Sequence, residues 1–112
     1  MVTQKKGDLA VSIAIGKLTE LNYNVLIPLT ESEQYDLVIE KDNVFKRVQV
    51  KYSSRNYVDL RRIHSNSKGY VVKKYNNGFD YLFIYKNNKD CFLIKRDLSG
   101  NSTITPKEEE KI

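Results

Sequence analysis

The chain has 112 residues, of which 40% are hydrophobic and 29% are charged, and this suits one small domain with a single core. Its 19 lysines and arginines outnumber its 14 aspartates and glutamates, so the formal net charge of +5 favours a polyanionic partner. A single cysteine excludes an internal disulfide, and no apolar run approaches the roughly 20 residues that span a bilayer. We therefore expect one soluble, intracellular domain over residues 1–112.

The first predicted element is a helix from Gly7 to Leu21. Its apolar residues recur at helical spacing, which gives it one face that can pack on a sheet. This face consists of Ala10, Ile13, Ala14, Leu18 and Leu21. Asp8 lies at the start of the segment, where it can cap free amide groups and complement the helix dipole.

Three short strands are predicted after the helix. The first, Val25 to Leu29, contains Pro28, which cannot donate to a ladder, so we expect it at an edge or strand end. The second is the apolar run 37–39, and the third, Val44 to Tyr52, alternates with period two. Asp42-Asn43 supplies the turn that joins the last two strands into a hairpin.

The hairpin would place three useful side chains at one edge of the sheet. Gln49 and Lys51 point to the same face, and Asp36 lies at the open end of the partner strand, opposite them. A carboxylate and an amide oxygen are hard ligands suited to Mg²⁺, for which Mn²⁺ could substitute. Lys51, charged beside a carboxylate, fits electrostatic stabilisation of a phosphorane better than general base catalysis. This grouping points to metal-assisted hydrolysis of a phosphodiester.

These residues resemble the motif of the PD-(D/E)xK nuclease superfamily, which has an acidic residue and, on the next strand, another acidic residue two positions before a lysine. Asp36, Gln49 and Lys51 match this motif, with Gln49 in place of the usual acid and Tyr35 in place of the proline. The Gln-x-Lys form is similar to a small branch of intron homing endonucleases and, more distantly, to archaeal Holliday-junction resolvases. The resemblance covers roughly Lys6 to Leu98. It implies an α/β fold with a restriction-endonuclease-like core, in which the N-terminal helix packs on a mixed central sheet.

The resemblance implies further parts of a metal site. The backbone carbonyl of Val50 would be an additional ligand. The first helix of the family often contributes a carboxylate, so Asp8 is either a helix cap or a supporting acid, unless the family's acidic position falls at Val11. Because the amide of Gln49 carries no charge, metal affinity should fall unless another carboxylate compensates.

Residues 53–77 follow Lys51 and are rich in cations, amides and tyrosines. We expect a short helix from Asp59 to His64 and a strand from Gly69 to Tyr75. The cations can meet DNA phosphates and the tyrosines can stack on bases, although an ordinary solvated surface remains the alternative. The residues predicted to contact DNA are Lys5, Lys6, Ser53, Arg55, Arg61, Arg62, Lys68, Lys73 and Lys74.

The last predicted elements are a hairpin and a short tail. Phe79 to Tyr85 and Cys91 to Lys95 are apolar runs separated by a polar turn, and Cys91 is expected as a small buried hydrophobe. Asp80 precedes the first of these strands, where a structural role is favoured although the resembled nucleases commonly have an aspartate there. Residues 105–112 are expected to form a short helix or a frayed end.

The combined prediction is a Mg²⁺-dependent DNA endonuclease, either homing-endonuclease-like or junction-resolvase-like. A site-specific enzyme of this size could make enough base contacts only as a multimer, so a homodimer or homotetramer is expected. One alternative is a catalytically inactive nucleic-acid-binding module of the same fold, in which Gln49 marks lost hydrolysis. Another is a basic α/β interaction domain in which the motif arose by chance. Retention of Asp36 together with Lys51 argues against inactivity, because charges at a buried edge are costly to keep.

Overall fold

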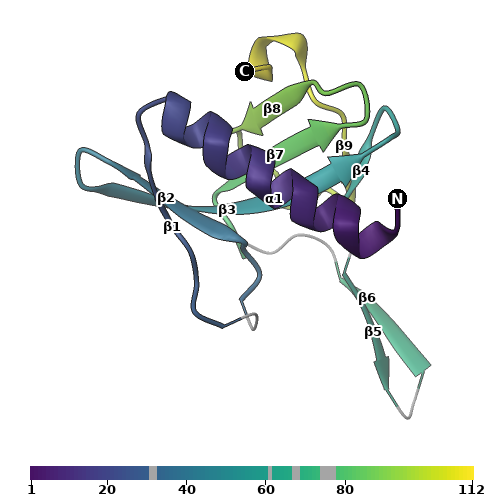
Figure 1. Cartoon of the computed structure of the whole chain (residues 1–112). Helices are drawn as coiled ribbons and strands as arrows, with labels where there is room; N and C mark the ends of the chain where they lie inside the picture. The colour runs from purple at the N-terminus through teal and green to yellow at the C-terminus, as the bar shows by residue number, and fades with distance from the viewer. Residues whose placement is uncertain (31–32, 61, 67–68, 74–77) are drawn as a thin grey trace.

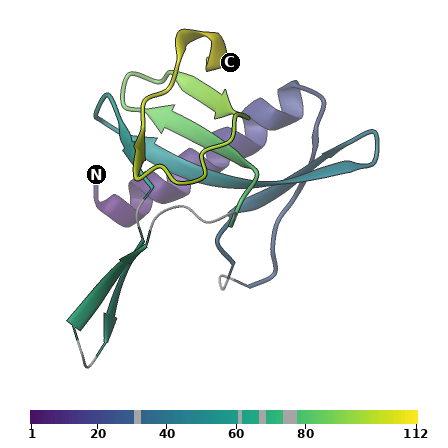
Figure 2. The ribbon, with the colours of Figure 1, turned by 180° about the vertical axis from the view of Figure 1, so that it is seen from behind.

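The computed structural model describes residues 1–30, 33–60, 62–66, 69–73 and 78–112, with the backbone alone for 62–66 and 69–73. Helix α1 (Thr3–Glu20) lies across one face of a five-stranded sheet, as Figure 1 shows. The C-terminal segment runs over the other face, which is visible in Figure 2. This arrangement confirms the predicted α/β fold with an N-terminal helix on a mixed sheet.

The sheet has the strand order β1-β2-β3-β7-β8. Its strands are β1 (Asn24–Leu26), β2 (Leu37–Lys41), β3 (Val44–Ser53), β7 (Tyr81–Lys86) and β8 (Cys91–Ile94). β3 and β7 are parallel and the other neighbours are antiparallel, so the sheet is mixed. The predicted order of one helix followed by three strands is confirmed. β1 is an edge strand, as Pro28 in the predicted segment indicated, and it ends two residues before that proline.

Each face of the sheet has its own apolar core. The core between the sheet and α1 contains the buried residues Ala10, Ala14, Leu18, Leu37, Ile39, Val48, Phe83, Tyr85, Cys91 and Leu93. The core on the opposite face contains Val58, Leu60, Phe79, Leu82, Ile84, Phe92, Ile94, Leu98 and Ile104. Burial of apolar surface on both faces fixes which side chains of each strand remain near solvent, because successive side chains alternate between faces.

Helix α1 begins at Thr3, four residues before the predicted start. Gln4, Lys5 and Lys6 in its first turn are good helix formers. The ammonium of Lys6 lies 5.5 Å from the ring centre of Tyr52, which ties this end to β3. Asp8 is therefore in the second turn rather than at the N-cap. The predicted capping role of Asp8 is wrong, because Val2 occupies the N-cap position and no acidic residue lies in the first turn.

The hairpin of β2 and β3 sets the register on which the site depends. Asp42 and Asn43 have φ angles of 53° and 66°, and two successive positive values are typical of the tight turns that match the twist of a hairpin. From this turn the ladder runs from the pair Lys41 and Val44 to the pair Leu37 and Val48. The predicted hairpin and its turn are confirmed.

Residues 53–77 contain strands where a helix was predicted. β4 (Val58–Asp59) pairs with β9 (Thr103–Ile104), while β5 (Arg62–Asn66) and β6 (Gly69–Lys73) form a two-stranded ribbon. The helix predicted from Asp59 to His64 is wrong. Val58 and Leu60 are buried in the core on the sheet face opposite α1, the second core, and this burial overrides local propensity. The predicted strand from Gly69 holds as far as Lys73, beyond which the prediction lies outside the described residues. The ribbon extends away from the sheet (Figures 1 and 2).

The C-terminal residues are attached to the sheet. The predicted hairpin of residues 79–95 is confirmed as β7 and β8, and Cys91 is buried as expected. A 3₁₀ turn, η1 (Glu108–Glu110), follows, and the backbone N–H of Ile112 donates to the carbonyl of Cys91 at 2.9 Å. The tail thus contains a 3₁₀ turn of three residues and is bonded to β8. In the described part of the chain, no helix is long and apolar enough to cross a membrane.

Candidate active site

The site begins where β2 starts, at Asp36. The backbone N–H of Asp36 donates to the carbonyl of Val48 at 2.9 Å, and its carboxylate Oδ2 accepts from the backbone N–H of Val50 at 2.7 Å. The carboxylate thus takes the place of a backbone acceptor beside β3, just beyond the end of the regular ladder. This bond holds the Asp36 carboxyl group at the open edge between the two strands.

Gln49 and Lys51 lie on the face of β3 that is turned away from α1. Their register partners on β7, Leu82 and Ile84, belong to the core on that face. Both side chains are half-buried, and the amide of Gln49 makes no hydrogen bond within the described residues. Between them, Val50 directs its N–H toward Asp36. The carbonyl of Val50 has the same direction, because both backbone groups of a strand residue face the same neighbour.

The electrostatics of Asp36 reflect this setting. Asp36 is exposed as a residue, but the protein around its carboxyl group withdraws that group from water, and this burial raises the pKa above its ordinary value. The hydrogen bond from Val50 and the positive charge of Lys51 each oppose the rise in the pKa. Lys51 therefore acts on Asp36 electrostatically across the edge between the strands.

These groups form a set of hard oxygen donors with one nearby cation. The set consists of the Asp36 carboxylate, the Gln49 amide oxygen and the Val50 carbonyl. Divalent cations such as Mg²⁺ are commonly held by one or two carboxylates, with waters and substrate phosphates completing the coordination, so this set, with its one carboxylate, could hold a divalent cation. Among the described residues, no cluster of three or more acidic, histidine or cysteine side chains is placed to hold a metal.

Comparisons with known proteins match the chain over nearly its whole length. The family model for PD-(D/E)XK endonucleases matches residues 1–111. The chain belongs to this family. Among solved structures, the bacterial homing endonuclease I-Ssp6803I has 30% sequence identity and a TM-score of 0.81, over 96% of this chain and 80% of that one. No curated protein matches significantly. The α/β fold of this PD-(D/E)XK endonuclease is thus restriction-endonuclease-like, as predicted.

Asp8 is not brought to the edge at Asp36. It lies two residues before the buried Ala10, which places it on nearly the opposite side of α1 from the sheet, and it is exposed. Val11, the other position considered for a family acid, packs partly against the core under α1. Because the exposed side of a packed helix points away from the sheet, we leave Asp8 out of the metal site.

The predicted DNA contacts fall into three groups. Ser53 is only 8% exposed and its hydroxyl binds loop backbone, so it is not available to DNA as predicted. Lys5 and Arg55 are exposed, and Lys6 is half-buried over the Tyr52 ring. Arg61, Lys68 and Lys74 lie outside the described residues, and only the backbone is described for Arg62 and Lys73, which are register partners in the β5–β6 ribbon.

One feature missed from the sequence is the partner of Asp80. The side chain of Arg47 donates to both carboxylate oxygens of Asp80, at 3.2 Å and 3.1 Å, and its backbone N–H donates to Asp80 Oδ2 at 2.8 Å. The backbone N–H of Asp80 returns a bond to the Arg47 carbonyl at 2.8 Å. These bonds confirm the structural role predicted for Asp80, at the opposite side of β3 from Asp36. Arg47 and Asp80 are 33 positions apart, so no local signal linked them.

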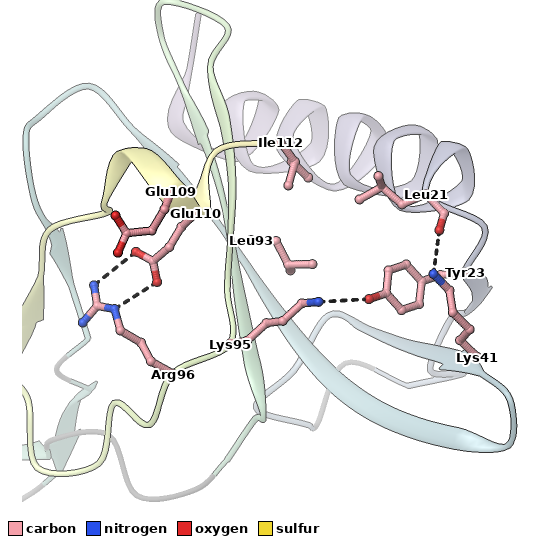
Figure 3. A pocket seen from close by; sticks show the side chains of 9 residues that line it. All are labelled: Leu21, Tyr23, Lys41, Leu93, Lys95, Arg96, Glu109, Glu110 and Ile112. Atoms are coloured by element: carbon pink, nitrogen blue, oxygen red, sulfur yellow. Dashed lines mark hydrogen bonds and ion pairs between the residues drawn. The ribbon is translucent and has the colours of Figure 1, made fainter.

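A pocket away from this site lies beside the C-terminal end of α1 and is drawn in Figure 3. Its cations are already engaged. Lys41 donates to the Leu21 carbonyl at 2.8 Å, Lys95 lies 3.4 Å from the Tyr23 hydroxyl, and Arg96 is paired with Glu110 at 2.9 Å. These contacts hold the end of α1 and the C-terminal tail against the sheet. We therefore assign the pocket a structural role and no binding function.

Proposed function

We propose that this PD-(D/E)XK endonuclease is a divalent-metal-dependent DNA endonuclease that hydrolyses phosphodiester bonds at the edge between β2 and β3. In this proposal Mg²⁺ is held by Asp36, Gln49 and the Val50 carbonyl, and Mn²⁺ can replace it. The observation that carries the proposal is the 2.7 Å bond from the Val50 N–H, which fixes the Asp36 carboxylate where the charge of Lys51 reaches it.

Each residue has a separate part in the proposed reaction. Bound Mg²⁺ would supply Lewis acidity toward a phosphoryl oxygen and would acidify a water molecule. Asp36 is held in one orientation by the Val50 N–H, so little reorganisation is needed when a metal or substrate arrives. The ammonium of Lys51 stabilises the negative charge that grows on the phosphoryl oxygens. Gln49 adds an oxygen ligand without a second negative charge, which keeps the edge less repulsive to a phosphodiester.

The substrate proposed is intracellular duplex DNA cut in the manner of a homing endonuclease, and similarity to I-Ssp6803I supports this choice over a junction resolvase. The β5–β6 ribbon supports it as well, because a two-stranded ribbon fits the major groove, where bases are distinguished. Its sequence contributes Arg62 and Lys73. Contacts to phosphates from Lys5, Lys6 and Arg55 would add affinity without sequence information.

Self-association completes this proposal, as a homodimer or homotetramer. Apolar side chains that are open to solvent lie on the edge strand β1, on the residues after it and at the start of β3. These are Leu26, Ile27, Leu29, Val44 and Phe45, of which Leu29 is fully exposed and Phe45 is 59% exposed. An apolar edge strand favours pairing with another chain, so this side of the sheet is the natural contact between copies.

The decisive experiment compares three substrates. Purified protein is incubated with supercoiled plasmid, linear duplex and a four-way junction, each with Mg²⁺, Mn²⁺ or EDTA. We expect metal-dependent cleavage of duplex that Asp36→Ala and Lys51→Ala each abolish while thermal unfolding stays cooperative. Cleavage of the junction alone would support a resolvase. DNA binding without cleavage under any condition would support the inactive module, which the missing charge at Gln49 favours.

A further inference from the structure

The loop between β3 and β4 is fixed although it is exposed. The buried Ser53 hydroxyl accepts from the backbone N–H of Arg55 at 3.2 Å. Its own O–H can donate to the Arg55 carbonyl at 3.1 Å or to the Tyr57 carbonyl at 3.3 Å. The Ser53 carbonyl accepts from the N–H of Asn87 in the β7–β8 turn at 3.1 Å. The loop is therefore tied both to itself and to the sheet.

Arg55 is held in position by Tyr57. Its Nη1 donates to the Tyr57 hydroxyl at 2.7 Å, and the centre of its guanidinium lies 5.7 Å from the centre of the Tyr57 ring. Within the described residues no carboxylate forms an ion pair with Arg55. A guanidinium has further N–H donors in a planar fork, and this geometry matches phosphate oxygens. Arg55 is thus an oriented cation with donors to spare.

The loop borders an open pocket of about 390 Å³ that runs from Lys51 to Asp59. Arg55 and Lys51 both line this pocket, and together they outnumber the single carboxylate of Asp59. Its remaining lining is mostly polar or aromatic and includes Ser54 and Tyr57, with Val58 as the one aliphatic side chain. Such a pocket suits a small anion that is part of a larger molecule better than an apolar ligand.

We propose that this pocket binds a backbone phosphate of the DNA strand being cut, with Arg55 as the phosphate ligand and Tyr57 as the residue that positions it. This inference rests on the proposed function, because it takes DNA as the polyanion. β3 advances about 3.3 Å per residue, so its end at Ser53 lies roughly 7 Å beyond Lys51. Because Lys51 and Arg55 line the same pocket, Arg55 would hold a phosphate close to the scissile one on that strand.

The test measures binding without catalysis. A fluorescein-labelled duplex of about 20 base pairs and mixed sequence is titrated with full-length protein in EDTA, and its anisotropy is followed at sodium chloride concentrations from about 50 to 200 mM. Loss of one phosphate contact lowers the slope of log K against log salt by about 0.9. We expect this decrease for Arg55→Ala and a slope like the wild type for Arg55→Lys, which keeps the charge. Lys95→Ala is the charge-matched control, and its slope should not change.

Tyr57→Phe separates positioning from charge. It removes the hydroxyl that holds the guanidinium but leaves the arginine, so affinity should fall about threefold with the salt slope preserved. An unchanged affinity would remove Tyr57 from the proposal.

A wild-type slope for Arg55→Ala, or no duplex binding by the wild type at the lowest salt, would overturn the phosphate site whether or not the protein cuts DNA. A reduced slope in a protein that never cleaves would uphold the phosphate site and overturn the proposed hydrolysis instead. Thermal unfolding of each variant confirms that the loop change leaves the fold intact.

Discussion

Asp36 and Asp80 stand on opposite sides of β3, and each carboxylate accepts a backbone N–H of that strand, yet their pKa values shift in opposite directions. Burial raises the pKa of Asp36, against the hydrogen bond from Val50. The side-chain hydrogen bond from Arg47 lowers the pKa of Asp80, against burial. One aspartate is therefore held at a cost in stability, as is common at functional sites, while the other stabilises the junction of two strands.

Asp36→Asn should make the protein more stable and inactive. Because the folded-state pKa of Asp36 is raised, its ionised form is destabilising at neutral pH, and wild-type stability recovers as pH falls through that pKa. Asparagine keeps an oxygen that can accept from Val50 but carries no charge. We expect a higher melting temperature than wild type at pH 7, a difference that shrinks on acidification, and no cleavage. A lower melting temperature at pH 7 would contradict the proposed cost of this carboxylate.

Asp80→Asn should have the opposite effect on stability. The lowered pKa of Asp80 means that its stabilisation is present above the ordinary value and is lost as pH falls through the folded-state pKa. The ion pair with Arg47 is partly exposed, so after solvent screening we expect a loss of about 1 kcal/mol at pH 7, or roughly 4 °C in melting temperature. Below the folded-state pKa the variant and the wild type should converge. Urea unfolding at pH 7 and at acidic pH measures both points.

Lys51→Ala should remove catalysis while keeping the fold. If its ammonium stabilises charge on the phosphoryl oxygens, the cleavage rate should fall by about 10²–10³-fold. Lys46→Ala is a matched control, because Lys46 lies on the same strand but on the helix-facing side, 5.9 Å from the Tyr81 ring centre. The control should leave the cleavage rate essentially unchanged. Equal losses in the two variants would show that the effect of Lys51 is general surface charge rather than local chemistry.

The sequence was most informative where structure is local. The alternation of β3 and the turn at Asp42-Asn43 were enough to place Gln49 and Lys51 on one face, because strand register follows from the turn. The start of α1 was missed, since Gly7 resembled a boundary and the contact of Lys6 with Tyr52 is distant in sequence. The hydrogen bond from the Val50 N–H to the Asp36 carboxylate depends on side-chain geometry, which a sequence pattern does not give.

Contacts between distant segments account for the other misses. The strand β4 exists because Val58 packs in the second core and pairs with Ile104, which is 46 positions away. The bond between Arg47 and Asp80 could not be predicted, because the alternation of residues along a strand assigns a side chain to a face but does not identify its partner. Ser53 looked like a surface residue among cations and is instead the buried anchor of its loop. The sequence pattern was enough to group Asp36, Gln49 and Lys51 at one edge of the sheet, and tertiary packing determined which neighbouring residues support that edge.

Gln49→Glu should change the metal dependence of cleavage more than it changes DNA affinity. A second carboxylate beside Asp36 would strengthen the attraction for a divalent cation, so the Mg²⁺ and Mn²⁺ concentrations for half-maximal cleavage should fall and their ratio should shift. DNA affinity in EDTA should change little, because one charge is altered among many phosphate contacts. Gln4→Glu adds the same charge at an exposed position of α1 and serves as the control. If Gln4→Glu shifts the metal midpoints equally, the effect is long-range electrostatics and Gln49 is not a ligand.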